Sequence, residues 1–105
     1  MNNVMIFDKL QESLWGRMLD AVNNYRQNKI TFSEFVNNLE STLIAGDFPD
    51  DESLLSRWYD KWTPLEILNA TYGDKAPIQE VEPYLSQMQN FLEKILRLVR
   101  NDSAI

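Results

Sequence analysis

Apolar residues recur at steps of three and four along most of this chain, and this spacing constrains its fold more than any other feature. The first row runs through Phe7, Leu10, Leu14, Met18, Val22 and Tyr25. The last row runs through Ile78, Val81, Leu85, Met88, Leu92, Ile95 and Val99. Such spacing places side chains on one face of an α-helix, and no stretch shows the sustained alternation that indicates a strand. The pattern predicts an all-α fold.

Capping and helix-breaking residues divide this pattern into segments. Gly46 and Gly73 suit helix ends, because glycine adopts the left-handed backbone of a C-terminal cap without strain. Thr63-Pro64-Leu65-Glu66 combines a capping box with a proline at the first helical position. It predicts a break near Thr63-Pro64, with one kinked helix as the alternative. We therefore expect a bundle of four principal helices, over about 3–28, 31–45, 51–72 and 78–100.

The length of 105 residues is enough for one domain, which would bury roughly 65% of its unfolded surface. We expect a single helical domain over residues 1–105, with a frayed tail at 101–105. Gly16 lies inside the first predicted helix, where glycine costs about 1 kcal/mol relative to alanine. Either another helix approaches closely at Gly16 or the chain tolerates this cost.

The segment from Lys29 to Phe35 has two interpretations. A twelve-residue calcium loop ending at Glu34 would place Ile30 at its eighth position, as an EF-hand requires. The first, third and fifth positions, which should carry oxygen ligands, hold Asn23, Tyr25 and Gln27. Thr31-x-x-Glu34 is instead a capping box, with Ile30 and Phe35 as its flanking hydrophobic pair. We therefore predict a helix start and no metal site.

The composition excludes several kinds of chemistry. Cysteine and histidine are both absent, so the chain has no disulfide, no thiol nucleophile and no imidazole base or ligand. Its three glycines are scattered, whereas a phosphate-binding loop needs them clustered at a helix start. We expect no catalytic residues, no cofactor and no metal, and we interpret the chain as non-enzymatic.

The net charge is −6, from 10 basic and 16 acidic residues. This balance disfavours nucleic acid, because binding requires the neutralisation of phosphates. No apolar run approaches the ~20 residues of a membrane span, and no basic region precedes the apolar residues near the N-terminus, so we expect no secretory signal. We expect a cytoplasmic protein with no nucleic-acid and no membrane partner.

Acidic residues are concentrated between Lys29 and Arg57, an interval without any lysine or arginine. The interval holds Glu34, Glu40, Asp47, Asp50, Asp51 and Glu52. An acidic rim beside aromatic anchors suits a basic protein partner, and Tyr59 lies off the apolar line of its helix. We predict partner binding by Asp47, Asp50, Asp51, Glu52 and Tyr59. The alternative is that Asp50, Asp51 and Glu52 cap helices and that Phe48 and Trp58 pack in the core.

The apolar row from Ile78 to Val99 resembles a coiled-coil seam in its spacing. A second row beside it makes the stripe as wide as that of a bundle helix. This second row consists of Tyr84, Phe91 and Leu98. We predict packing in the bundle core, with dimerisation through this helix as the alternative, so we expect a monomer or a homodimer. The basic residues Lys94, Arg97 and Arg100 complement the dipole of the last turns.

Lys29-Ile30-Thr31-x-x-Glu34-Phe35, after an amphipathic helix in a small acidic helical chain, resembles the colicin D immunity type of bacterial protein. The resemblance covers roughly residues 1–45. It implies a cytosolic inhibitor whose acidic side chains occupy the nucleic-acid site of a nuclease toxin. The segment from Trp58 to Pro64 has no counterpart in it, so no interface residues are carried over; a small helical bacterial protein of another kind is the alternative.

These observations lead to three hypotheses about function. The first is a non-enzymatic protein-binding module, in the manner of an immunity inhibitor, with a basic partner. The second is a structural or regulatory homo-oligomer that assembles through the C-terminal helix. The third is an enzyme of an unrecognised type, which a deep pocket lined by converging carboxylates would favour.

Overall fold

The computed structural model describes residues 9–46 and 52–104 of the chain, and the side chains of residues 12–46 and 52–99 within them. It contains four α-helices and one short 3-10 helix: α1 (Lys9–Arg26), α2 (Phe32–Gly46), α3 (Glu52–Tyr72), η2 (Gly73–Lys75) and α4 (Ile78–Ala104). The predicted all-α fold with four principal helices is confirmed. Residues 3–8, which we expected to begin the first helix, lie outside the described residues.

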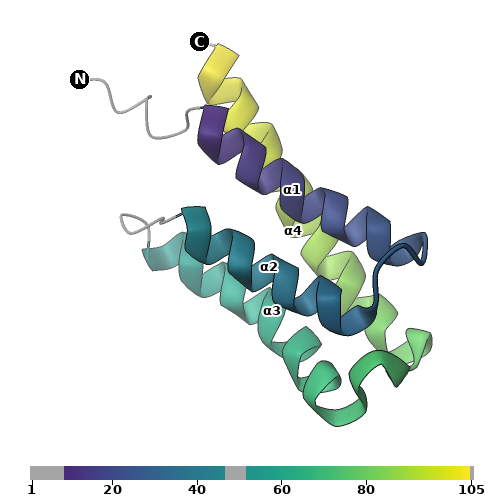
Figure 1. Ribbon diagram of the computed structural model, residues 1–105. Helices are drawn as coiled ribbons and strands as arrows, with labels where there is room; N and C mark the ends of the chain where they lie inside the picture. Colours follow the sequence, from purple (N-terminus) through teal and green to yellow (C-terminus); the bar gives the residue numbers. More distant parts are fainter. Residues whose placement is uncertain (1–8, 47–51, 105) are drawn as a thin grey trace.

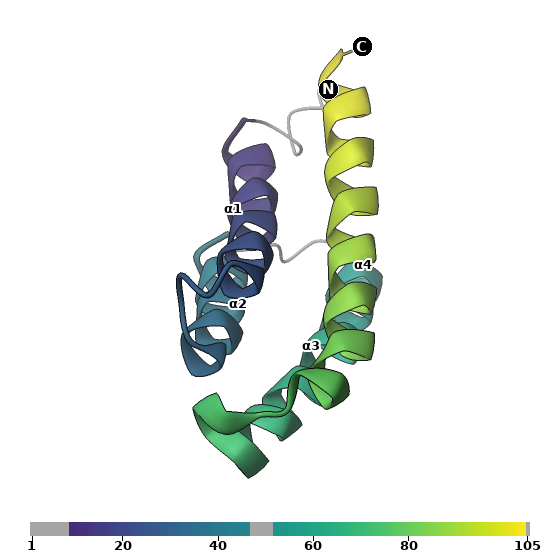
Figure 2. The same ribbon diagram turned by 90° about the vertical axis from the view of Figure 1, so that its right-hand side faces the viewer.

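Each helix packs on two neighbours. The helix α1 contacts α2 and α4, and α3 contacts the same two helices from the opposite side. Successive helices run in opposite directions, so α1 and α3 run one way and α2 and α4 the other (Figure 1). Figure 2 shows α4 as the longest rod, with α1 alongside it. The described residues form a four-helix bundle of 48 × 25 × 21 Å.

The core contains the apolar stripes that the sequence pattern predicts, with contributions from all four helices. Among the largest buried side chains are Trp15, Met18, Phe32, Phe35, Trp58, Leu65, Leu85, Met88 and Leu92. Full burial of one such side chain stabilises the fold by roughly 1.5–3 kcal/mol. The periodic rows are therefore the main source of stability.

The turn between α1 and α2 is closed by backbone and side-chain hydrogen bonds. Asn28 has a φ of 60°, the left-handed conformation that ends many helices. The amide of Lys29 donates to the carbonyl of Asn24 at 2.8 Å, and that of Asn28 to Tyr25 at 3.0 Å. This pair of bonds is the Schellman motif, and Asn28 takes the position that glycine usually fills.

The predicted capping box opens α2. The Thr31 amide donates to Glu34 Oε1 at 2.8 Å, and the Glu34 amide donates to Thr31 Oγ1 at 3.1 Å. The Ser33 amide donates to Asp74 Oδ1 at 3.0 Å, so a residue of η2 supplies a further cap. This bond is the main cause that lowers the pKa of Asp74 below its ordinary value of 3.8. Two parts of the chain therefore satisfy the free amides at the start of α2.

The predicted break near Thr63-Pro64 is wrong. Residues 52–72 form one α-helix with Pro64 inside it, so Thr63 is not an N-terminal cap. The Trp62 indole donates to the carbonyl of Val36 in α2 at 3.0 Å, and Leu65 is buried on the other side of the proline. Packing on both sides of Pro64 outweighs the local signal for a helix start.

The predicted seam of α4 lies within the core of this one chain. Val81, Leu85, Met88, Leu92, Ile95 and Val99 are all buried, and Ile78 is 54% exposed. Bundle packing, which we preferred to a coiled-coil seam, thus accounts for the row. The helix begins at Ile78 and continues to Ala104, past the predicted end at residue 100, and the fraying of residues 101–105 stays a prediction.

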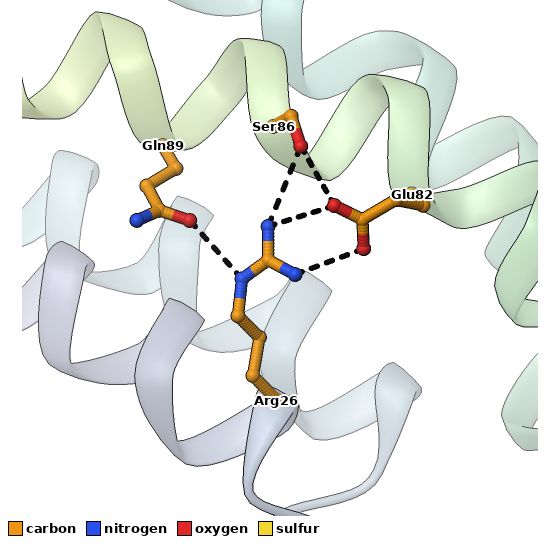
Figure 3. Close-up of polar contacts among 4 residues, drawn as sticks. All are labelled: Arg26, Glu82, Ser86 and Gln89. Atoms are coloured by element: carbon orange, nitrogen blue, oxygen red, sulfur yellow. Dashed lines mark hydrogen bonds and ion pairs between the residues drawn. The ribbon is translucent and has the colours of Figure 1, made fainter.

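A polar clamp holds α1 against α4 (Figure 3). The Arg26 guanidinium donates to both carboxylate oxygens of Glu82, at 2.8 and 3.1 Å, and its Nε donates to Gln89 Oε1 at 3.0 Å. Ser86 donates to the same carboxylate at 2.7 Å. The hydrogen bond from Arg26, followed by that from Ser86, lowers the pKa of Glu82 below its ordinary value of 4.5. The clamp is solvent-accessible, so it contributes about 1 kcal/mol or less and fixes the pairing of the two helices.

Candidate functional site

The structure describes only some of the five residues predicted to bind a partner. Asp47, Asp50 and Asp51 lie outside the described residues. Glu52 is exposed in the first turn of α3, and Tyr59 is half-buried two turns later. The structure therefore places two of the five predicted residues, and both lie on the same helix.

Tyr59 is held in place by two tryptophans. Its ring meets Trp58 edge-on at a centroid distance of 4.9 Å and Trp62 edge-on at 5.8 Å. The two indoles are stacked on each other at 5.9 Å, and Trp62 is bonded to the backbone of α2. Edge-to-face aromatic pairs each add about 0.5–1.5 kcal/mol beyond burial. Contacts within the chain therefore fix the position of the Tyr59 ring.

A carboxylate from α2 faces the Tyr59 hydroxyl. Burial raises the pKa of Tyr59 above its ordinary value of 10.0, and the charge of Glu40 and its hydrogen bond to the phenol raise it further. The phenol therefore stays protonated at neutral pH and donates to Glu40. This contact joins α2 to α3 at the half-exposed edge of the aromatic cluster.

Two further carboxylates lie on the same line of α3 as Tyr59. Glu52 is seven residues before it and Glu66 seven residues after it. Each carboxylate is therefore turned by only ~20° from Tyr59 around the helix and lies ~10 Å from it along the axis, and the two carboxylates differ by ~40°. Glu52 is exposed and Glu66 half-exposed. We call Glu40, Glu52, Tyr59 and Glu66 the acidic face. The acidic face presents Glu40 in contact with Tyr59, and Glu52 and Glu66 on either side of Tyr59 along α3.

Glu34 does not belong to the acidic face, although it is part of the acidic interval of the sequence. Its side chain bonds the Thr31 amide at the start of α2. The predicted role of Glu34 in a capping box is therefore confirmed.

A cationic groove between α3 and α4 was not predicted. It has a volume of about 420 Å³. Its lining residues are Arg57, Asp60, Lys61, Gln87, Asn90, Phe91, Lys94, Ile95 and Leu98. We interpreted Lys94 from sequence only as a complement to the helix dipole. The spacing of Arg57 and Lys61, one turn apart, was a signal that could have indicated this edge.

The two surfaces lie on opposite edges of α3. Arg57 and Lys61 are each ~160° from Tyr59 around the helix, and the buried row of Leu54, Trp58 and Leu65 lies between the two edges on the core side. One edge therefore carries carboxylates toward α2, and the other carries cations toward α4.

The described residues include no group of three or more acidic side chains arranged to hold a metal ion. Among the helices described here, none is long and apolar enough to cross a membrane. No family model, curated protein or solved structure matches this chain. The resemblance to colicin D immunity proteins therefore stays a prediction.

Proposed function

We propose that this protein is a non-enzymatic protein-binding module that recognises a basic protein partner through its acidic face. The observation that carries the proposal is the position of Tyr59, which two tryptophans and Glu40 fix at the centre of that face. Rigid tyrosines surrounded by polar residues are typical centres of protein interfaces.

The charge around Tyr59 supports a basic partner. Glu40 contacts it, Glu52 and Glu66 lie on either side of it along α3, and α2 contains neither lysine nor arginine. Complementary charge speeds encounter and excludes partners of the wrong sign. An inhibitor of the immunity type, which presents acids to the nucleic-acid site of a toxin, would use this kind of surface.

Affinity purification from the native host tests the proposal. The bait is the wild-type protein, compared with a Glu52→Lys/Glu66→Lys variant. An Asp20→Lys/Glu93→Lys variant has the same change in net charge and serves as the control, because these two exposed residues lie on α1 and α4.

We expect wild type and control to recover a common basic protein, which the acidic-face variant loses at least about tenfold. Added salt should weaken the capture. The proposal fails if no basic protein is enriched, or if the acidic-face variant captures it as well as the control does.

A further inference from the structure

The cationic groove has an apolar floor and a charged rim. Phe91 and Ile95 form the floor and are 9% and 6% exposed, and Leu98 is 54% exposed. Arg57 and Lys61 project from α3 and Lys94 from α4. The rim cations thus belong to both walls, with apolar side chains between them.

The charge of this groove is opposite to that of the chain. Its lining contains three cations and one carboxylate, Asp60, whereas the whole chain carries −6. Within the described part of the chain, Arg57, Lys61 and Lys94 take part in no ion pair. The groove therefore concentrates cations that pair with no acidic side chain among the described residues.

Burial of apolar surface and charge complementarity together define the occupant. Leu98 follows Phe91 by two helical turns, ~10 Å along α4, which matches the spacing of apolar residues on one face of a second helix. An amphipathic helix binds a groove by such residues at every third or fourth position. Carboxylates flanking its apolar face would meet the cations of both walls.

From this geometry we propose that the groove between α3 and α4 binds an acidic amphipathic helix of a partner protein. This site is separate from the acidic face and does not depend on the proposed function of that face. A nucleic acid is a poorer occupant, since its many phosphates would also meet the net negative charge of the whole protein.

Backbone-amide NMR with the isotope-labelled full chain tests the proposal. The probe is a synthetic helical peptide with leucines at steps of three and four and glutamates beside them. Two control peptides match it: one with lysines in place of the glutamates, and one with the same composition in scrambled order. Sodium decanoate is added separately as a small anionic amphiphile.

We expect the acidic helix to shift the amides of Lys61, Phe91 and Leu98, with much weaker effects from both control peptides. A Lys61→Glu/Lys94→Glu variant should bind at least about tenfold more weakly. An Arg17→Glu/Lys75→Glu variant has the same net charge and should bind as wild type does, because these exposed residues lie on α1 and η2.

The apolar contribution has its own matched pair of variants. Leu98→Ala should weaken binding several-fold, by about the transfer free energy of the lost methyl groups. Ile67→Ala removes an equally exposed apolar side chain, at 58%, from α3 outside the groove. It should leave the affinity unchanged.

Three results would overturn the proposal. The first is the absence of groove shifts at peptide concentrations of about 1 mM, or equal shifts from the lysine peptide. The second is binding of decanoate alone, which would make the occupant a small anionic amphiphile. The third is self-association in sedimentation equilibrium that the Lys61→Glu/Lys94→Glu variant abolishes, which would make the occupant the acidic face of a second copy.

Discussion

At the scale of single residues, Gly16 has space for a side chain. Apart from its chain neighbours and the nearby backbone of α1, no described atom lies within 4 Å of a Cβ at this position, so the prediction that another helix approaches closely there is wrong. Gly16→Ala should stabilise the protein by roughly 0.5–1 kcal/mol, because alanine favours the helix interior. Urea denaturation measures the change, and Gly73→Ala is the control. Gly73 has a φ of 59°, so alanine there should destabilise instead.

Thr31 is the residue whose local role is best defined. It bonds the Glu34 amide through its hydroxyl and receives the Glu34 carboxylate on its own amide. Thr31→Ala should lower the free energy of unfolding by about 1 kcal/mol, while Thr31→Ser should lose much less. Equal losses in the two variants would contradict the capping role, since serine keeps the hydroxyl. Chemical denaturation of the three proteins is the measurement.

Two carboxylates make stability depend on acid pH. The folded protein lowers the pKa of Asp74 through the Ser33 amide and that of Glu82 through Arg26. Their stabilisation is complete above the ordinary values of 3.8 and 4.5 and is lost as the pH falls through the lower folded values. Asp74→Asn and Glu82→Gln should each be less stable than wild type at pH 7. The gap should narrow as the pH falls through the lower folded values, in urea titrations across the acid range.

At the scale of elements, α3 tests how packing competes with a local signal. Pro64 has no amide to donate to the Asp60 carbonyl, a cost that one continuous helix must bear. Pro64→Ala should therefore raise the free energy of unfolding by roughly 1–2 kcal/mol, after allowance for the freer unfolded chain. If Pro64 instead began a separate helix, alanine would be neutral or destabilising. Thermal and urea unfolding distinguish the two outcomes.

The same motif behaves differently in two elements, which shows what could be predicted. Thr31-x-x-Glu34 caps a helix because Asn28 has already ended the preceding one. Thr63-x-x-Glu66 does not, since the buried positions of α3 stay in phase across it only if the helix is uninterrupted. Spacing of apolar residues predicted the helices and most of the core. It could not predict that Trp62, two residues before Pro64, would bond α3 to the Val36 carbonyl of α2.

Only part of the candidate site could be predicted from the sequence, because its contacts join different helices. Glu52 and Tyr59 could be selected from the charge pattern along the chain, and the seven-residue spacing to Glu66 was also visible there. The contact between Tyr59 and Glu40 depends on antiparallel packing of α2 and α3. The groove depends likewise on α3 meeting α4, so its cations were dispersed along the sequence and gave no compact motif.

At the scale of the whole molecule, the bundle separates its charges by the way α3 sits between two neighbours. The edge toward α2 carries the acidic face, and the edge toward α4 carries the cations of the groove. The net charge of −6 alone would describe only an acidic protein. The arrangement instead provides two surfaces of opposite sign on the two edges of α3.

The most direct test of the central claim is site-specific photo-crosslinking in the native host. A benzophenone amino acid replaces Ser56, an exposed residue between Glu52 and Tyr59, and in the control it replaces exposed Arg17 on α1. Recognition of a basic partner by the acidic face predicts a crosslinked protein of net positive charge from position 56 alone, lost when Glu52 and Glu66 become lysine. A crosslink of equal yield from position 17, or none from position 56, would contradict it.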